Sequence, residues 1–310
     1  MIGLSMKNVL ILALKKLLPL FFIGIIALIT GDKAFGWGFW AHKEINKRAI
    51  QLLPPPMKEF FLDHAEYIIE HSIDPDQRRS MGDSLEAYNH YLDIDYYGTY
   101  PFGALPRNYD SAVAKFGVDT VRKQGVVPWR IAALTDSLAN AMRRKDEEGI
   151  LHFSADLGHY VADSHVPLHA VVDYDGVRRG QRGIHKRWES DLAERFAQSY
   201  TFPTEGVLTI DDPLMYAFNT ILESYRCADS VLNADAEAQL KVPGAKQVKR
   251  VYSKGDTAFV FSAAYYDSLR TLDNGLLERR MQKAVISLAS CWLTAWVRAG
   301  KPGLHAVKKK

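Results

Sequence analysis

The chain has 310 residues and carries 39 lysines and arginines against 36 aspartates and glutamates, a formal net charge of +3. Its two cysteines, Cys227 and Cys291, are too few to provide a disulfide framework. Their spacing leaves open whether they form one bridge or remain separate thiols. The length after the first 36 residues fits one domain with a sizeable hydrophobic core.

The N-terminal segment, residues 1–36, has the pattern of a secretory signal peptide. Three lysines precede an apolar run at 17–30, and small residues at 34–36 offer a cleavage point near Gly36. A membrane anchor is the alternative, but the run is shorter than the roughly 20 residues that span a bilayer. We therefore expect a mature chain that begins at Trp37, is secreted or periplasmic, and keeps no membrane span.

The positive charge of the chain lies mostly in this segment. Removing residues 1–36 takes away four lysines and one aspartate and leaves 35 basic and 35 acidic residues. Sequence-independent affinity for nucleic acid comes from neutralising phosphates with Lys and Arg. A neutral mature chain therefore has no general electrostatic attraction for DNA or RNA.

After the predicted cleavage point, apolar residues recur at helical spacing. We expect helices at 42–53, 57–71, 128–144, 147–163, 185–199 and 213–232, and one or two further helices at 256–300. Glycines and prolines predict an irregular excursion at 96–125 and a polar loop at 173–183. The apolar stretch at 285–293 is the expected core helix. Long alternating strand patterns are absent, so the sequence predicts an all-α, single-domain, multi-helix fold.

Histidines and carboxylates are concentrated in the middle of the chain. His159 and Asp163 stand four residues apart, which places both side chains on one face of a helix. His169 follows shortly after, and His185 and Glu189 repeat the four-residue spacing. Such nitrogen and oxygen ligands suit a borderline metal such as zinc.

Polar and aromatic neighbours of these residues are expected to have supporting roles. His152 and Asp156 share the stripe of the expected helix, and we expect them to orient the ligands. His165 is expected to be a solvent-facing turn residue, and Trp188 is expected to support the ligands next to it.

Further candidates lie upstream of this cluster. They are Trp37, which cleavage would make N-terminal, His42, Asp76 and His90. Arg79 follows Asp76 at a spacing of three residues. Asp74 is an alternative to Asp76, but Asp76 is preferred for its distance to His90 and its relation to Arg79.

In chain order the pattern reads Trp, His, Asp, His, His-x-x-x-Asp-x-x-x-x-x-His and His-x-x-x-Glu. It resembles the superfamily that joins bacterial zinc-dependent phospholipases C with single-strand-specific zinc nucleases. The resemblance implies a phosphodiesterase domain at 37–310 with three zinc ions in a cleft. It implies one zinc on Asp76, His90, His159 and Asp163, a second on the amino nitrogen and carbonyl oxygen of Trp37 with His42 and Asp163, and a third on His169, His185 and Glu189.

The activity that this resemblance implies is hydrolysis of phosphodiester bonds by metal-activated water, without a Ser or Cys nucleophile. Asp76 would act as a base toward the attacking water, and Arg79 would contact the phosphate. The substrate would be a phospholipid headgroup or a single-stranded nucleic acid. We expect the enzyme to be a monomer.

The motifs favour different branches of this superfamily. Glu189 matches the lipase branch, since the nucleases usually place Asp there. The short interval from Trp37 to His42, and Arg79, match the nuclease branch. Together with the neutral mature chain and the short loop at 173–183, the sequence favours a phospholipase C-like enzyme over a nuclease. A secreted zinc-binding module without turnover is a further alternative, and the complete ligand set argues against it.

Overall fold

The structure, a computed structural model, describes residues 37–251 and 257–304. The predicted signal peptide at 1–36 lies outside these residues. The chain divides into two compact units, and the larger one, Ala34–Lys249 with Ala258–Lys310, contains all the predicted ligands. Within the described ranges, no helix is both long and apolar enough to cross a membrane.

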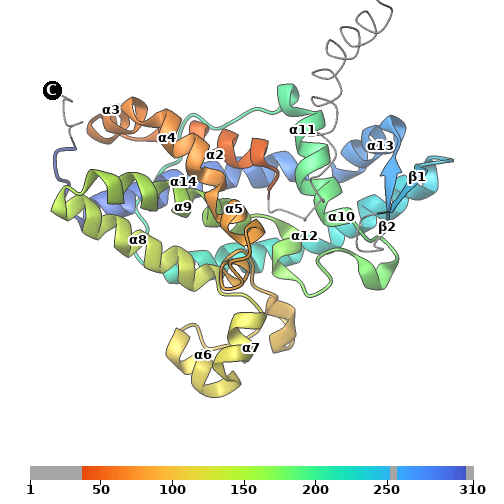
Figure 1. Ribbon diagram of the computed structural model, residues 1–310, viewed down its shortest axis with the longest axis horizontal. Helices are drawn as coiled ribbons and strands as arrows, with labels where there is room; N and C mark the ends of the chain where they lie inside the picture. The colour runs from red at the N-terminus through yellow and green to blue at the C-terminus, as the bar shows by residue number, and fades with distance from the viewer. Residues whose placement is uncertain (1–36, 252–256, 305–310) are drawn as a thin grey trace, which may run out of the picture. The chain divides into compact units, whose positions relative to one another are not determined.

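Helices make up nearly all of the regular structure in the described residues (Figure 1). They are α2 (Phe39–Leu52), α3 (Pro55–Asp63), α4 (Ala65–Glu70), α5 (Asp74–Ser80), α6 (Tyr109–Phe116), α7 (Val118–Lys123), α8 (Val127–Arg144), α9 (Glu147–Ser164), α10 (Ile184–Lys186), α11 (Ala193–Arg195), α12 (Pro213–Lys241), α13 (Ala263–Asp273) and α14 (Leu276–Arg298). The strands β1 (Lys246–Val251) and β2 (Thr257–Phe261) pair in one sheet. The predicted all-α class is confirmed. The two strands were not predicted, because five or six residues are too few to show a clear alternation.

The helix expected at 57–71 is divided, and the irregular excursion expected at 96–125 is partly helical. The helix expected at 57–71 is broken at His64, whose backbone leaves the helical region, into α3 and α4. The segment 96–125 contains α6 and α7, which are separated by Gly117 at φ +82°. A glycine adopts this left-handed conformation without steric cost, so it ends one helix and begins the next. The side chain of Asn108 caps α6 by accepting a hydrogen bond from the backbone of Ser111.

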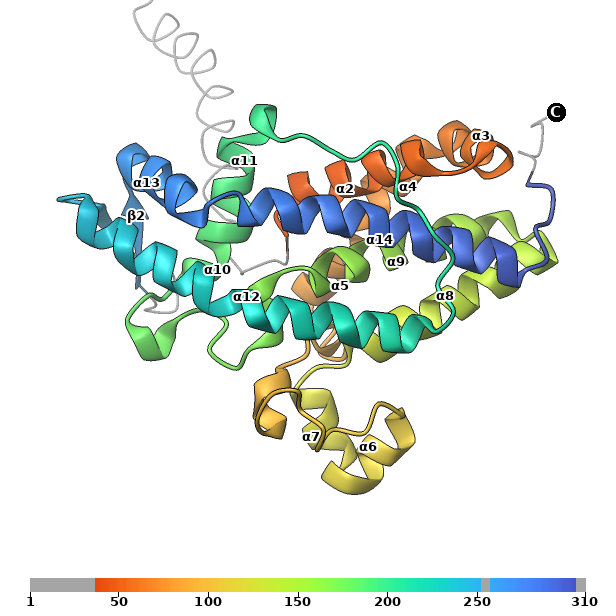
Figure 2. The same cartoon turned by 180° about the vertical axis from the view of Figure 1, so that it is seen from behind.

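Helix α14 forms the predicted core helix, and it packs against α2, α8 and α9. It lies behind α9 in Figure 1 and in front of it in Figure 2. Val285, Leu288 and Trp292 are fully buried on it. The indole of Trp292 donates to Ser154 O on α9 at 3.2 Å and packs on Phe61 with ring centroids 4.9 Å apart. These contacts fix the helix that carries His159.

The two cysteines are unpaired. Cys227 lies on α12 and Cys291 on α14. Burial raises the pKa of the Cys291 thiol to about 12, so this side chain is a neutral part of the core. The alternative of separate thiols therefore holds in this structure.

Helices α2 and α9 approach each other closely at Gly158. A Cβ atom added at this glycine would lie 2.0 Å from Oδ1 of Asn46, which is fully buried on α2. The Asn46 amide donates to the backbone oxygen of His42 at 2.9 Å. The absence of a side chain at Gly158 therefore sets the distance between the helix of His42 and the helix of His159.

We predict that Gly158→Ala lowers the free energy of unfolding by about 1–3 kcal/mol, because the added methyl group clashes with Asn46. In an unconstrained helix interior the same change raises the free energy of unfolding by about 1 kcal/mol, so a decrease instead of an increase identifies the clash. Urea denaturation measures the effect. In the double variant, Asn46→Ala should restore much of the lost stability. A Gly158→Ala protein as stable as the parent would contradict the prediction.

Candidate metal centre

Helix α9 provides the middle of the candidate site. Its N-terminus is capped by Asp146, whose carboxylate accepts a hydrogen bond from Gly149 N. Near its C-terminus, His159 and Asp163 are fully buried, with His159 Nε2 3.2 Å from Asp163 Oδ2. Ionisable groups on a buried helix face require partners, because burial of an unpaired charge is unfavourable.

Three other elements bring side chains to this pair. His42 projects from α2, Asp76 from the first turn of α5, and His90 from the end of the 3₁₀ helix η3 (Glu86–Asn89). The His42 ring stacks on the His159 ring with centroids 4.0 Å apart. His90 Nδ1 lies 3.7 Å from Asp76 Oδ1. All of these side chains are buried.

Asp163 directs its two carboxylate oxygens toward different histidines. Oδ1 lies 3.5 Å from His42 Nε2 and 3.7 Å from His169 Nδ1. Oδ2 lies 2.9 Å from His90 Nδ1 and 3.2 Å from His159 Nε2. A carboxylate placed in this way can serve two cations, one with each oxygen.

Trp37 lies against the same carboxylate. Its backbone N–H donates to Asp163, and its indole Nε1 donates to Ala162 O at 2.7 Å. Its ring packs on Trp188 at a centroid distance of 5.4 Å, and Trp188 donates to Asp273 Oδ1 at 2.7 Å. The nitrogen that the predicted cleavage would free therefore already lies beside the central carboxylate.

A second cluster combines His169 from the 3₁₀ helix η5 (Pro167–Ala170), His185 from α10 and Glu189 from η7 (Arg187–Leu192). Glu189 Oε2 lies 2.9 Å from His185 Nε2 and 3.5 Å from His169 Nε2. The sequence predicted an ordinary α-helix here, whereas η7 is a turn of π-helix. Such wider turns often occur at functional sites.

The candidate ligand atoms gather in three sets, within each of which all the atoms lie within 4.8 Å of one another. The sets are His42 with Asp76 and His159, His90 with His159 and Asp163, and His169 with His185 and Glu189. The third set has the composition expected from the resemblance. The first two share His159, and they place His42 nearer to the Asp76 group than expected. These buried clusters could each hold a metal ion.

Backbone carbonyls fix the orientation of two of the histidines. His159 Nδ1 donates to Ser72 O at 2.9 Å, and His169 Nδ1 donates to His90 O at 2.9 Å. A carbonyl oxygen only accepts, so the proton of each ring resides on Nδ1 and the Nε2 lone pair is available. This is the arrangement by which proteins orient histidines that bind metal ions.

Most of the other candidate ligand atoms, which are ring nitrogens and carboxylate oxygens, are buried and make no hydrogen bond to any of the residues that the structure describes. They are both ring nitrogens of His42 and His185, both oxygens of Asp76 and Glu189, His90 Nε2 and Asp163 Oδ1. Buried polar atoms are nearly always paired, because each unpaired group costs about 1–3 kcal/mol. Lone pairs that converge in this way fit cations, which would satisfy several of them at once.

Burial also sets the pKa values in this region. It raises the pKa of Glu189 to about 7, and it raises the pKa of Asp76 and Asp163 in the same direction. Burial lowers the pKa of His42, so that this ring is neutral. The neutral His42 ring gives these carboxyl groups no positive charge, and a divalent cation would add to the single charge of Arg79 nearby.

A pocket of about 370 Å³ opens beside these ligands. It is lined by Arg79, Ala87, His90, Tyr91, Asp93, Leu168, His169, Tyr174 and His185. Burial raises the pKa of Asp76, Asp163 and Glu189, and the charge of Arg79 opposes this rise at all three, so it acts on both clusters. Asp93 and Tyr174 were not predicted as site residues. Only the short spacing from His90 to Asp93 could have indicated the former.

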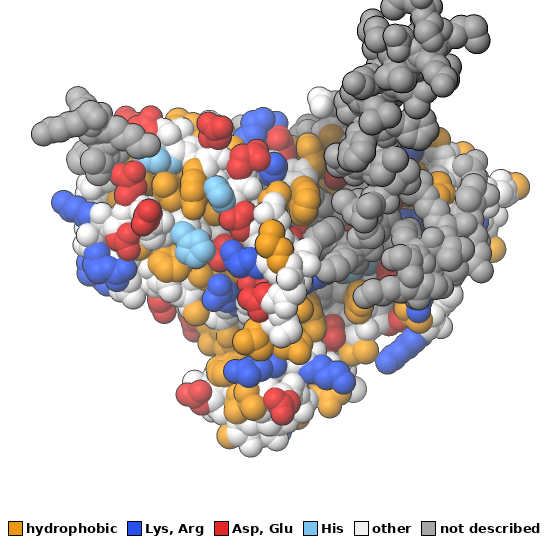
Figure 3. All heavy atoms as spheres, viewed as in Figure 1, with side chains coloured by type: hydrophobic (Ala, Val, Ile, Leu, Met, Phe, Trp, Pro, Cys, Tyr) orange, Lys and Arg blue, Asp and Glu red, His pale blue; other side chains and the backbone are white. Residues whose placement is uncertain are grey.

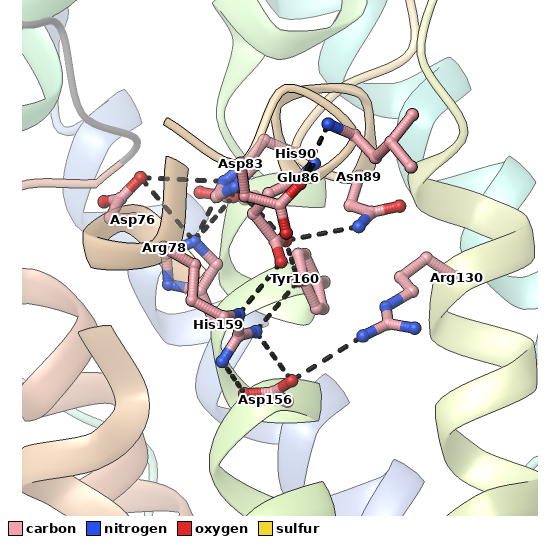
Figure 4. A network of polar contacts seen from close by, with 12 residues as sticks. Asp76, Arg78, Asp83, Glu86, Asn89, His90, Arg130, Asp156, His159 and Tyr160 are labelled. Carbon is pink, nitrogen blue, oxygen red and sulfur yellow. Dashed lines mark hydrogen bonds and ion pairs between the residues drawn. The ribbon is translucent and has the colours of Figure 1, made fainter. Parts of the chain in front are cut away.

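Adjacent Arg78 has a different environment and was missed by the sequence analysis. Its guanidinium donates to Asp156 Oδ2 at 2.8 Å and to Glu86 Oε2 at 3.0 Å (Figure 4). The hydroxyl of Tyr160 donates to the other oxygen of Glu86, which lies 3.7 Å from His90 Nε2. Arg78 therefore ties α5 and the segment of His90 to α9. Asp156 lies 78 residues away along the chain, and Glu86 lies beyond the turn that ends α5, so no helical spacing revealed either partner.

Two supporting roles predicted from the sequence are wrong. The side chain of His152 is 52% exposed, and Asp156 binds Arg78 rather than a candidate ligand. His165, expected to face solvent, is buried, and its Nε2 accepts from Ser287 Oγ at 3.0 Å. Burial lowers the pKa of His165 to about 3, so it is a neutral core residue.

The structure also distinguishes the two aspartates of α5. Asp76 is fully buried among the histidines. Asp74 is only partly buried and binds His71 Nδ1 at 2.7 Å, away from the candidate ligands. The geometry therefore places Asp76, the preferred candidate, at the site.

No family model and no curated protein sequence matches this chain. Among solved structures, it is similar to the alpha toxin from Clostridium absonum, with 14% identity and a TM-score of 0.49 over 85% of this chain and 64% of the toxin. It is also similar to the Clostridium perfringens alpha-toxin isolated from avian strain SWCP, with 13% identity and a TM-score of 0.49 over 84% of this chain and 63% of the toxin. The chain thus spans less than two thirds of the length of either toxin.

We predict that zinc binds more weakly, and displaces more protons, at about pH 6 than at about pH 8. The raised pKa values keep carboxyl protons bound up to about neutral pH, and these protons must leave before a cation binds. Calorimetry in two buffers of different ionisation enthalpy measures the protons released. Glu189→Gln, which cannot titrate at this position, should release fewer. Equal proton release at both pH values in the parent protein would contradict the prediction.

Proposed function

We propose that this protein is a secreted or periplasmic zinc-dependent phosphodiesterase of the phospholipase C type. The observation that carries the proposal is the convergence of buried nitrogen and oxygen donors without hydrogen bonds beside a pocket that contains Arg79. Histidine and carboxylate are donors that zinc prefers in proteins. When bound, zinc would supply Lewis acidity that activates water near neutral pH and stabilises the charge of the leaving oxygen.

On this proposal every predicted ligand has a defined task. The residues that would hold three ions are Asp76, His90, His159 and Asp163 for one, Trp37, His42 and Asp163 for another, and His169, His185 and Glu189 for the third. Asp163 would be shared, which its two divergent oxygens permit. Removal of residues 1–36 would provide the free amine at Trp37.

Two residues would act on the substrate. Arg79 would bind the phosphate with two guanidinium N–H groups, a geometry that lysine cannot reproduce. Asp76 would accept the proton of the attacking water, since its two oxygens are buried without a hydrogen bond among the described residues. The monomer would thus need no nucleophilic side chain.

The choice between a phospholipid and a nucleic acid as substrate depends on the residues around the expected position of the phosphate. Glu189 and the neutral mature chain favour a phospholipid headgroup. The pocket also fits the second candidate, a single-stranded nucleic acid, because Tyr91 and Asp93 line it together with Arg79. An aromatic ring stacks on a base, and a carboxylate accepts from an amino group of a base. The same two groups would suit a cationic headgroup, so a direct assay must decide.

We predict that the mature protein beginning at Trp37 hydrolyses a phosphodiester and that a chelator abolishes this activity. Release of phosphocholine from phosphatidylcholine and degradation of single-stranded DNA are measured in parallel, each with and without chelator. Phosphocholine release favours the phospholipase, and DNA degradation favours the nuclease. Activity that persists with chelator would refute the metal mechanism. Failure on both substrates would favour a zinc-binding module.

We predict that Arg79→Ala lowers kcat/KM at least about 100-fold while zinc content is retained, because a charge contact to the phosphate is lost. The neighbouring change Arg78→Ala serves as the matched control. It should chiefly lower the free energy of unfolding, by about 1–3 kcal/mol, because the buried carboxylates of Asp156 and Glu86 lose a hydrogen-bonding partner. Kinetics, zinc analysis and urea denaturation are measured on both. An active Arg79→Ala enzyme would contradict the assignment.

A further inference from the structure

A second pocket, of about 510 Å³, is lined in part by residues of η3, which also contributes to the pocket beside the candidate metal centre. It is lined by the following residues of η3, α6, α7 and α8 and of the segments beside them: Leu85, Tyr88, Asn89, Tyr109, Arg122, Val126, Trp129, Arg130 and Ala133. Its volume is within the range of small-molecule sites. On the face shown in Figure 3, apolar and basic side chains gather where α6 and α7 join the other helices.

Two of the aromatic rings that line this pocket, those of Trp129 and Tyr109, are held by contacts with their neighbours. Trp129 Nε1 donates to Arg107 O at 2.6 Å, and the ring of Tyr109 meets the Trp129 ring edge to face with centroids 5.5 Å apart. Tyr88 adds a third ring, and its backbone oxygen accepts from Val126 N at 2.8 Å. Rings that are already fixed offer stacking surfaces at little cost in entropy.

The charge of the pocket is positive. Arg122 and Arg130 line it, and no carboxylate is among its lining residues in the described part of the chain. The Nε of Arg130 is buried without a hydrogen bond to any described residue. Its Nη2 lies 3.6 Å from an oxygen of Asp156 that already binds Arg78 at 2.8 Å. Arg130 therefore shares Asp156 with Arg78, and its Nε remains available to donate to a ligand.

Arg122 is exposed on α7, and its guanidinium makes no hydrogen bond or ion pair to any residue in 37–251 or 257–304. Helix α8 begins beside the same pocket with Val126 as its N-cap, a side chain that cannot accept a hydrogen bond. The positive end of its dipole adds to the two guanidinium groups. The pocket thus combines donors for an anion with flat apolar surfaces.

The short segment from Leu85 to Tyr91 connects this pocket to the metal centre. Tyr88 and Asn89 line the aromatic pocket, whereas His90 and Tyr91 line the pocket of the metal centre. In the view of Figure 4, Asn89 and Arg130 lie on one side of Tyr160 and Asp76 lies on the other. A ligand in the aromatic pocket would therefore contact the residue next to a candidate metal ligand.

We propose that this aromatic pocket is a nucleotide-binding site, distinct from the metal centre, which takes a base on its rings and a phosphate on Arg122 and Arg130. Arginine is the preferred partner of phosphate, and base stacking on aromatic side chains contributes about 1–3 kcal/mol per base. A lipid headgroup offers the phosphate but no ring. The site does not depend on the proposed function, because its occupancy can be measured without hydrolysis.

The test uses calorimetric titration of the zinc-loaded protein with adenosine 5′-monophosphate. Arg122→Ala should weaken binding about tenfold, since it removes a charged donor to the phosphate. Lys123→Ala is the matched control, because it removes the same charge from the neighbouring position of α7 and does not line the pocket. It should leave the affinity within about twofold, as expected of an exposed charge outside the contact.

Two further ligands test the two parts of the site. Inorganic phosphate and phosphocholine should each bind at least about tenfold more weakly than the nucleotide, because they lack the stacked ring. Equal affinity for phosphocholine would overturn the proposal in favour of a headgroup site. Unchanged nucleotide affinity in Arg122→Ala would also overturn it, since it would place the nucleotide at the metal centre. Retained zinc content in both variants confirms that they are folded.

Discussion

The carboxylate of Asp163 is buried between four histidines, and the surrounding helices are arranged around it. Two of these histidines approach each oxygen, and the backbone of Trp37 adds a donor. The helices of His42 and His159 can come this close because Gly158 has no side chain to displace Asn46. The positions of the candidate ligands therefore depend on the contact between Gly158 and Asn46, neither of which is a candidate ligand. Packing in the core is as important to the site as the ligand atoms themselves.

The same burial creates an electrostatic deficit. Three carboxyl groups are removed from water, and burial lowers the pKa of His42 and His90, so that these rings offer lone pairs rather than positive charge. Without a cation the carboxyl groups retain protons at pH values where an exposed carboxylate would have lost them. A cation bound at these clusters would link folding to metal binding, since it would supply the positive charge that the buried carboxyl groups require. Burial of these groups without hydrogen-bond partners lowers the free energy of unfolding, and it leaves their lone pairs available.

Much of the fold, and the grouping of the candidate ligands on shared helix faces, could be predicted from local sequence patterns. The four-residue spacings of His159 with Asp163 and of His185 with Glu189 predicted which side chains share a face, because helical periodicity is local. Whether a position is covered by another element is not local, and this is why His165 was placed in solvent although α14 covers it. Arg78 was invisible for the same reason, since Asp156 lies 78 residues away along the chain. The short helices α6 and α7 were obscured by the glycine between them.

Neighbouring arginines on α5 have separate tasks because successive residues of a helix point about 100° apart. One of them connects structural elements, and the other lines the pocket. The gain of a single residue early in α5 would turn Arg78 to the direction that Arg79 now takes, toward the pocket. The loss of one would turn Arg79 to the direction of Arg78, toward Asp156 and Glu86. This short helix should therefore tolerate substitutions on its outer face far better than changes in its length.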